Sequence, residues 1–310
     1  KPKNSAVLDV YNGLLMLQHR GQDAAGIVTY DGKKFHEQRG NGLVRDVFNN
    51  QNIQKLTGNM AMGHVRYPTA GTSDSSEAQP FFVNSPFGIY MIHNGNLTNT
   101  AEKSIKIREK YHRYLKTESD TEVLLNTFAD KIYTQIKKET ADPIELTFNA
   151  VSSLMKDIKG AYAIISMING IGMLMFRDPN GIRPLSFGKK STTAGDEYMF
   201  ASEDAAFHPS GFVKVRDVKP GEAILITLDG KIHTHQCVPG NLSPCIFEYI
   251  YLARPDSMMD DISVYKFQLR LGDTLAKQVQ ASGLEIDSII PVPDSSRPVA
   301  LELSKATGIK

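Results

Sequence analysis

Apolar side chains recur at helical spacing close to the start of the chain. Between Ala6 and Leu17, valines and leucines at positions 7, 10, 14 and 17 fall on one face of a helix. The same period predicts amphipathic helices over residues 121–135, 143–158 and 264–280. The chain is therefore expected to contain several helices that each bury one face.

Other stretches are rich in β-branched and aromatic residues and are bounded by turn formers. Residues 26–38, around Asp31-Gly32, and residues 223–236 each have the pattern of a β-hairpin. Because antiparallel strands outnumber the interleaved helices, we predict an α+β fold of two antiparallel sheets packed face to face and covered by helices. Single strands are predicted over residues 59–65, 87–92, 161–167, 172–176 and 198–202.

The pattern changes after Gln236. Residues 237–245 form a turn-rich connector, and residues 248–265 read as an ordered crossing segment with aromatic anchors. Residues 286–308 have the form strand, loop, helix, which is typical of the start of an α/β domain with a parallel sheet. We therefore predict two domains, residues 1–236 and residues 237–310.

Composition narrows the classes of protein to consider. The 35 Lys and Arg residues against 34 Asp and Glu leave a net charge of +1, which predicts no general attraction to nucleic acid or to an anionic membrane. Only two cysteines, Cys237 and Cys245, are present, too few for a disulfide scaffold, so a cytoplasmic location is the default expectation. No apolar run approaches the roughly 20 residues that span a bilayer.

The stretch His93-Asn94-Gly95-Asn96 follows an apolar run and permits two interpretations. Asn-Gly is a strong turn former, so the strand is expected to end there in a tight turn. Alternatively, the Asn94 side-chain amide and the Gly95 backbone N–H point at one spot and hold a developing oxyanion. The residues alone do not choose between the two.

Two charged residues are candidates for binding an amino acid. Arg66 follows an apolar strand; it is either a solvated or ion-paired side chain or a fork for a carboxylate, to which Thr69 adds a hydroxyl. Asp120 precedes a predicted helix that Ser119 is expected to cap, with Glu122 in the position of a capping box. Capping by Ser119 leaves Asp120 for an ammonium group. Together, Arg66 and Asp120 would define a pocket for an α-amino acid.

A metal site and a serine hydrolase are weakly supported. His19, His64 and His93 lie beside strand ends without paired spacing or a cysteine cluster, which favours packing or hydrogen-bonding roles. No G-x-S-x-G sequence is present.

A series of motifs along the whole chain resembles the amidophosphoribosyltransferase family, also called glutamine phosphoribosylpyrophosphate amidotransferases. The shorter motifs, HRG, HNG and SDTE, are similar to all class II glutamine amidotransferases, whereas RDPNGIRPL with YLARPDS is specific to this family. The resemblance is carried by LQHRGQDAAGI, GHVRYPTAGTSDSSEAQPF, HNGNLTN, ESDTE, KGAYA, FRDPNGIRPLSFG, EYIYLARPDS and PVPDSS, in this order.

The resemblance implies a fold and an activity. The family has a glutaminase domain of the Ntn-hydrolase type, a four-layer αββα sandwich, and a phosphoribosyltransferase domain that uses the released ammonia to convert phosphoribosylpyrophosphate into 5-phosphoribosylamine, the first step of purine synthesis. It implies that Arg66, with Thr69 nearby, binds the glutamine α-carboxylate and that Asp120 binds the α-ammonium. It also places Asn94 and Gly95 in the oxyanion hole, so that the turn is expected to form and also to present these two donors to the tetrahedral intermediate. Members are usually homo-oligomers.

Two features of the sequence depart from the family. Family members begin with a cysteine on a short strand, whose thiolate is the nucleophile and whose α-amine is the base. This sequence begins with Lys1, and Cys237 and Cys245 lie far along the chain. Either about ten preceding residues are omitted or the protein is a degenerate homologue. We favour omission, because the oxyanion donors and both residues that would bind the amino acid are retained. The paired acids and Gly-Thr-Thr turn of the phosphoribosylpyrophosphate loop are also missing before Lys310.

Three further positions receive expectations from the resemblance. Ser295 is placed near the Mg²⁺ and pyrophosphate, although without the resemblance Asp294-Ser295-Ser296 is simply a helix N-terminus. Cys245 matches one of four ligands of the [4Fe–4S] cluster of some members, but a structural cysteine is the preferred interpretation. Tyr67 is the best candidate to line a passage for ammonia, although aromatic residues at strand edges are usually core or interface residues.

Two alternatives to this function remain. One is another class II amidotransferase such as glucosamine-6-phosphate synthase, which the sequence of residues 289–308 argues against because a sugar isomerase domain would not open in that way. The other is a catalytically silent module that binds an amino acid. The expected partners are thus glutamine and phosphoribosylpyrophosphate, with neither nucleic acid nor a membrane.

Overall fold

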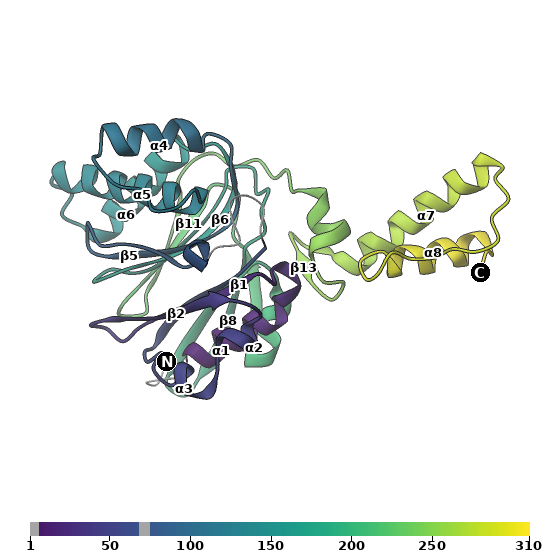
Figure 1. Ribbon diagram of the computed structural model, residues 1–310, viewed down its shortest axis with the longest axis horizontal. Coiled ribbons are helices and arrows are strands. Elements are labelled where there is room, and N and C mark those ends of the chain that lie inside the picture. Colours follow the sequence, from purple (N-terminus) through teal and green to yellow (C-terminus); the bar gives the residue numbers. More distant parts are fainter. Residues whose placement is uncertain (1–5, 68–74) are drawn as a thin grey trace.

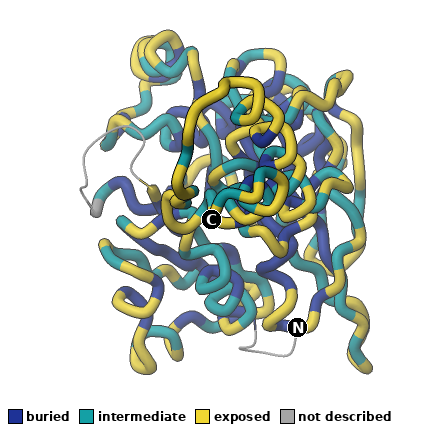
Figure 2. The backbone as a smooth tube through the Cα atoms, turned by 90° about the vertical axis from the view of Figure 1, so that its right-hand side faces the viewer, coloured by how far each residue is buried: buried dark blue, intermediate teal, exposed yellow. Residues whose placement is uncertain are grey.

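The fold divides into a broad sandwich of sheets and helices and a narrow helical arm (Figure 1). The structure is a computed structural model that describes residues 6–67 and 75–310. The arm consists of α7 (Val264–Ser282) and α8 (Arg297–Thr307), which pack against each other away from the sandwich. Figure 2 shows that much of the arm is exposed.

The largest sheet has six antiparallel strands in the order β12-β11-β7-β6-β5-β4. Its outer face is covered by three helices, and the apolar cluster between them contains fully buried side chains such as Leu124, Phe128 and Phe176. The strands are β4 (Phe81–Val83), β5 (Ile89–Leu97), β6 (Gly160–Ile168), β7 (Gly172–Arg177), β11 (Glu222–Thr227) and β12 (Ile232–Gln236). The helices are α4 (Thr100–Glu109), α5 (Asp120–Lys137) and α6 (Pro143–Met155).

Two three-stranded antiparallel sheets, ordered β2-β1-β3 and β10-β8-β9, pack against the inner face of the large sheet. Helix α1 (Ala6–Met16) packs on β1 and β3, so that helices form a fourth layer (Figure 1). The strands are β1 (Ala24–Tyr30), β2 (Phe35–Asn41), β3 (Met60–Arg66), β8 (Ser186–Thr192), β9 (Gly195–Ala201) and β10 (Val213–Asp217). Short helices are α2 (Val44–Val47), α3 (Asn50–Ile53), and the 3-10 helices η1 (Gln18–Arg20), η2 (Ser75–Glu77) and η3 (Asp204–Ser210).

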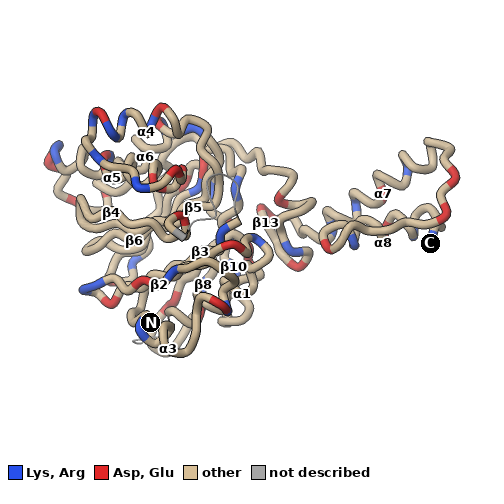
Figure 3. The backbone as a smooth tube through the Cα atoms, viewed as in Figure 1, with Lys and Arg blue, Asp and Glu red and all other residues tan. Residues whose placement is uncertain are grey.

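This architecture confirms the predicted α+β fold of packed antiparallel sheets covered by helices, and it is consistent with an Ntn-hydrolase sandwich. Within residues 6–67 and 75–310, no helix has the length and apolar character needed to cross a membrane. Lys and Arg are interspersed with Asp and Glu over the sandwich, in agreement with the small net charge (Figure 3). The predicted domain boundary at residue 237 stays a prediction.

Two local predictions were wrong. β5 does not end in a turn at Asn94-Gly95 but continues to Leu97, because β6 extends alongside and pairs Asn94 with Ala163 and Gly95 with Tyr162. The strand predicted at the start of residues 286–308 is not formed, since no neighbouring strand in the described part of the chain pairs with it. The helix of that unit is present as α8.

The segment that joins sandwich and arm is held by polar contacts. It contains a single turn of π-helix, η4 (Glu248–Leu252), and the small hairpin β13 (Met258–Met259) and β14 (Ile262–Ser263). The guanidinium of Arg177 is fully buried and binds the carboxylate of Asp260 in the hairpin turn through two bonds of 2.7 and 2.8 Å. Three backbone carbonyls accept its remaining N–H groups, so Arg177 ties the turn to the sandwich.

Candidate functional site

Gly95 lies within β5 where only glycine fits. Its φ is +157°, and a Cβ built there would lie 2.0 Å from the carbonyl oxygen of Ala161 and 2.6 Å from Nε2 of His93. Any side chain would therefore collide with the backbone of β6. The Asn-Gly pair marks a close approach of two strands, not the predicted turn.

The backbone of β5 directs alternate N–H groups away from β6. The N–H of His93 donates to Oε1 of Gln79 at 2.7 Å, and that of Leu97 donates to Oδ2 of Asp120 at 3.0 Å. In an antiparallel strand, the residue midway between them points its N–H to the same side. The Gly95 N–H thus faces the side on which Gln79 and Asp120 lie.

Asp120 sits at the start of α5, directly after its N-cap. The Ser119 hydroxyl accepts a hydrogen bond from the Thr121 N–H, which confirms the predicted cap, whereas Glu122 binds the N–H groups of Lys116 and Thr117. Burial alone would raise the pKa of Asp120. Its hydrogen bonds to His93 and to the Leu97 N–H outweigh burial and hold the pKa below its usual range.

His93 fixes the position of Asp120 relative to β5. Its ring is buried, and Nδ1 lies 3.3 Å from Oγ1 of Thr121 and 3.5 Å from Oδ1 of Asp120. The Gln79 amide donates to both the His93 carbonyl and the Thr121 hydroxyl. His93 thus has a hydrogen-bonding role in the structure, one of the two roles that the sequence favoured.

Arg66, at the end of β3, is buried and bound by two carboxylates. Nη1 donates to Asp23 at 3.0 Å, and Nη2 donates to Glu77. Because Glu77 is two residues before Gln79, the segment that binds Arg66 also binds β5 and the start of α5. Residues 77–79 therefore link Arg66 to β5 and to Thr121, the residue after Asp120. Thr69 lies outside the described residues.

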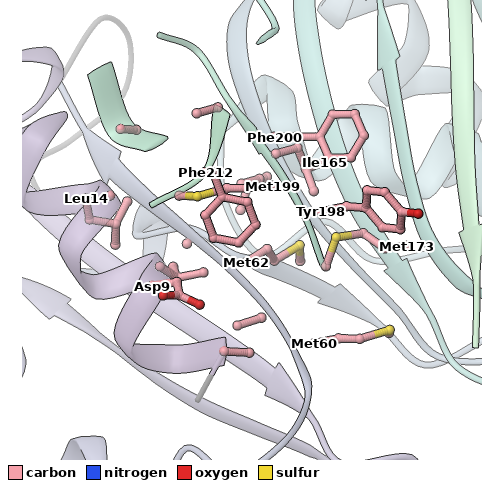
Figure 4. A pocket seen from close by; sticks show the side chains of 18 of the residues that line it. Asp9, Leu14, Met60, Met62, Ile165, Met173, Tyr198, Met199, Phe200 and Phe212 are labelled. Atoms are coloured by element: carbon pink, nitrogen blue, oxygen red, sulfur yellow. The ribbon is translucent and has the colours of Figure 1, made fainter. Parts of the chain in front are cut away.

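A cavity of about 280 Å³ lies between the two small sheets, bordered by α1 (Figure 4). Its walls are β3 and β9, each of which is the last strand of its sheet. Methionines and aromatic side chains from β3, β7 and β9 face it, among them Met62, Met173 and Tyr198 (Figure 4). The cavity is thus a slot between two sheet edges that pair with no further strand among residues 6–67 and 75–310.

Polar residues gather along one part of this slot. Asn94 of β5 lines it together with Arg20, His64 and Ser202, and the Asn94 Nδ2 donates to the Ser202 hydroxyl at 3.3 Å. Gly95, Arg66 and Asp120 are not among the lining residues. Asn94 is therefore the predicted site residue that connects the slot to the Asp120 side of β5.

His64 carries no charge at neutral pH. Burial, followed by the neighbouring His93, lowers the pKa of His64 to about 3. Its Nδ1 is buried and has no hydrogen-bond partner among the described residues. A neutral imidazole therefore borders the slot.

Several residues of the site carried no sequence signal of their own. Asp23 and Glu77 bind Arg66, and Gln79 binds the backbone of His93, but each is an ordinary polar residue in a loop or a short 3-10 helix. Glu203 follows β9 and was likewise not singled out. Only the juxtaposition of distant segments reveals their roles.

The remaining predicted positions do not line the slot that Asn94 borders. Tyr67 follows β3 and is 62% exposed. Ser295 is in the turn before α8, in the arm, and the adjacent Asp294 is ion-paired with Arg297. Cys245 is half-buried and donates its backbone N–H to Ile182, while burial raises the pKa of the Cys237 thiol to about 11.

The described residues do not by themselves form a site for Mg²⁺ or an iron–sulfur cluster. Mg²⁺ requires near-octahedral oxygen ligands, and a [4Fe–4S] cluster requires four thiolates. In the part of the chain that the structure describes, no three His, Cys, Asp or Glu residues gather as ligands. Ser295 and Cys245 each supply one candidate atom.

Comparison with known proteins agrees with this fold. Residues 64–209 match the family described as glutamine amidotransferase domain. The chain is 51% identical to the amidophosphoribosyltransferase of Pseudomonas aeruginosa, with 97% of the chain and 60% of that protein covered. It is 49% identical to the amidophosphoribosyltransferase of Escherichia coli, with 96% and 60% covered.

A solved structure is similar over nearly the whole chain. The glutamine phosphoribosylpyrophosphate amidotransferase of B. subtilis aligns with a TM-score of 0.82 at 36% identity, with 99% of this chain and 62% of that chain covered. The chain spans about three fifths of the length of these relatives. The fold, the order of the motifs and these similarities lead to one assignment: the chain belongs to the amidophosphoribosyltransferase family.

Proposed function

We propose that the sandwich hydrolyses glutamine and supplies ammonia for the synthesis of 5-phosphoribosylamine from phosphoribosylpyrophosphate. The observation that carries the proposal is the arrangement on β5. There the Asn94 amide faces the slot, while the Gly95 N–H faces the side of Asp120. Adjacent residues thus present one donor to the slot and one to the side of a carboxylate that is ionised at neutral pH.

The chemistry assigns a role to each of these groups. Asn94 and Gly95 would donate to the oxyanion that forms when the glutamine amide carbon becomes tetrahedral. Asp120 would bind the α-ammonium of glutamine and Arg66 its α-carboxylate. Arg66 would exchange its contacts with Asp23 or Glu77 for the substrate, because both carboxylates already occupy its guanidinium. Thr69 would add a hydroxyl to the same carboxylate.

The nucleophile needs a place next to Asn94, and the slot provides one. β3 and β9 are edge strands that face each other across the slot, so an additional strand between them would pair on both sides. We propose that a strand preceding residue 1 in the native protein lies there and carries a cysteine whose thiolate attacks the amide. The α-amine of that cysteine would accept the proton that the thiol loses.

Further features of the proposal come from the sequence motifs and from the name of one relative. Phosphoribosylpyrophosphate appears in the name of the similar B. subtilis enzyme. We include Mg²⁺ at the phosphoribosyltransferase site, with Ser295 as one ligand, ammonia transfer past Tyr67, a cytoplasmic location and a homo-oligomeric state. Cys245 stays a structural cysteine in this proposal.

The test is ammonia release from glutamine by the native gene product and three variants. Asn94→Ala should lower kcat by about 10²- to 10³-fold, because one oxyanion donor is lost. Asp120→Asn should mainly raise KM for glutamine, since the partner of the ammonium is neutralised. Asn96→Ala is the matched control, because Asn96 lies on the same strand but is exposed.

Two outcomes would contradict the proposal. Absence of glutamine-dependent ammonia release by the native protein would support the silent amino-acid-binding alternative. Equal activity of Asn94→Ala and Asn96→Ala would remove Asn94 from the oxyanion hole. Pyrophosphate release that depends on both glutamine and phosphoribosylpyrophosphate would test the second half of the reaction.

A further inference from the structure

Glu203 is a fully buried carboxylate at the end of β9 that bridges two distant segments. Its Oε1 accepts a hydrogen bond from Nη1 of Arg20 at 2.7 Å and lies 2.8 Å from Nε2 of His19. Its Oε2 accepts from the Arg254 backbone N–H at 2.9 Å and from the Ser257 hydroxyl at 2.7 Å. We call Glu203 and these four partners the Glu203 cluster.

Glu203 holds its charge although its carboxylate is buried. Burial alone would raise the pKa of Glu203, but the hydrogen bond from His19 and the charge of Arg20 outweigh it and lower the pKa to about 2. The other nitrogen of His19, Nδ1, lies 3.1 Å from the carbonyl oxygen of Met16. Glu203 thus contacts the Arg20 guanidinium, the His19 imidazole and two neutral donors.

The residue next to Glu203 contacts the proposed oxyanion hole. Ser202 immediately precedes Glu203, and its hydroxyl accepts the hydrogen bond from Nδ2 of Asn94. A primary amide has two N–H groups, and a partner on one of them fixes the direction of the other. The orientation of the Asn94 amide thus depends on where the end of β9 is held.

Arg20 adds a second connection to the same place. It lines the slot with Asn94, and its Nη2 binds both oxygens of Glu248, at 3.0 and 2.8 Å. The segment after residue 245 therefore binds Arg20 through Glu248. It binds Glu203 through residues 254 and 257. The end of β9 is fixed between η1 and this segment by ionised groups.

We propose that Glu203 is a positioning residue for Asn94. The charge of Glu203 anchors the end of β9, and Ser202 transmits that position to the Asn94 amide. This inference rests on the proposed glutaminase function but concerns a residue that touches neither substrate nor nucleophile. Removing the charge should leave glutamine binding intact and misdirect the oxyanion donor.

The test compares Glu203→Gln and Ser202→Ala with a matched control in the native protein. Glu203→Gln should lower kcat for glutamine hydrolysis by about 10- to 100-fold, the effect of a small misplacement of a catalytic group. KM for glutamine should change by less than about threefold, because such a loss is confined to the transition state. Ser202→Ala should lower kcat similarly, and the double variant should be no worse than either.

Two further variants separate positioning from general damage. Glu222→Gln also removes a buried carboxylate charge, one that binds Arg216 and the Lys219 N–H, and should keep wild-type kcat. Glu203→Asp keeps the charge and should recover part of the lost kcat. Unchanged kcat in Glu203→Gln, equal losses in Glu222→Gln, or additive losses in the double variant would each overturn the proposal.

A structural readout keeps the inference separate from the proposed function. In a crystal structure of Glu203→Gln, the Asn94 Nδ2 should no longer lie within hydrogen-bonding distance of the Ser202 hydroxyl. An unchanged contact would overturn the positioning role, even in a protein that hydrolyses glutamine. If the native protein releases no ammonia, the proposed function fails, while the displaced amide would still show that Glu203 sets the orientation of Asn94.

Discussion

At the scale of single residues, the imidazole of His64, whose Nδ1 is buried, couples stability to pH. Its pKa is about 3 in the folded protein, against roughly 6.5 in an unfolded chain. Between these values the unfolded state binds more protons, so stability is fully present above about pH 6.5 and falls as the pH drops toward 3.

His64→Gln should remove this part of the pH dependence. We expect the gap in unfolding free energy between wild type and His64→Gln to shrink from pH 7.5 to pH 4.5, measured by urea unfolding. His208→Gln, which removes an exposed imidazole, is the control. Parallel pH curves for wild type and His64→Gln would show that His64 is not kept neutral by the fold.

The residue types that could touch a substrate were recognisable in the sequence, but their supporting partners were not. Asn94, Gly95, Arg66 and Asp120 stood in short motifs whose chemistry suggested roles. Which carboxylate would bind Arg66 depends on how η2, which contains Glu77, lies relative to the end of β3, more than ten residues away. Such partners are set by tertiary contacts, which local spacing does not encode.

At the scale of elements, Gly95 allows β5 to pair with β6 along its whole length. Gly95→Ala should destabilise the protein by about 3 kcal/mol, since a methyl group would enter the space of the Ala161 carbonyl. Gly170→Ala is the matched control: its φ is +77° and a Cβ there meets nothing within 4 Å, so strain alone should cost about 1 kcal/mol. Chemical unfolding measures both, and equal costs would contradict the close-approach argument.

Periodicity located elements well where the element buries one face. The helices predicted over 121–135, 143–158 and 264–280 are present as α5, α6 and α7, with boundaries shifted by a few residues. The turn predicted at Asn94-Gly95 was wrong because the local preference of Asn-Gly yields to pairing with β6. A strand needs a partner, and the absence of pairing at residues 286–293 shows the same dependence.

At the scale of the whole molecule, the Arg177–Asp260 pair attaches the segment after residue 245 to the sandwich. Asp260→Asn leaves the buried guanidinium without its counter-charge, which costs about 3–5 kcal/mol when a buried pair is broken. We expect the segment to detach locally and chymotrypsin to cleave faster at Phe247 and Tyr251. Mass spectrometry of the fragments measures this.

Asp256→Asn is the control for that prediction, because Asp256 forms an exposed pair with Arg254 that contributes little to stability. Equal cleavage rates in wild type and Asp260→Asn would show that other contacts hold the segment. The layered architecture was predictable from the order of strands and helices. These attachments were not, since they join residues more than 80 positions apart.

The slot between β3 and β9 has a consequence for timing. A strand clasped by hydrogen bonds along both of its edges loses its freedom to swing before any reaction begins. A reactive group at the end of such a strand would already be oriented before the substrate binds. The entropy cost of orienting it would therefore fall on folding and not on every catalytic cycle.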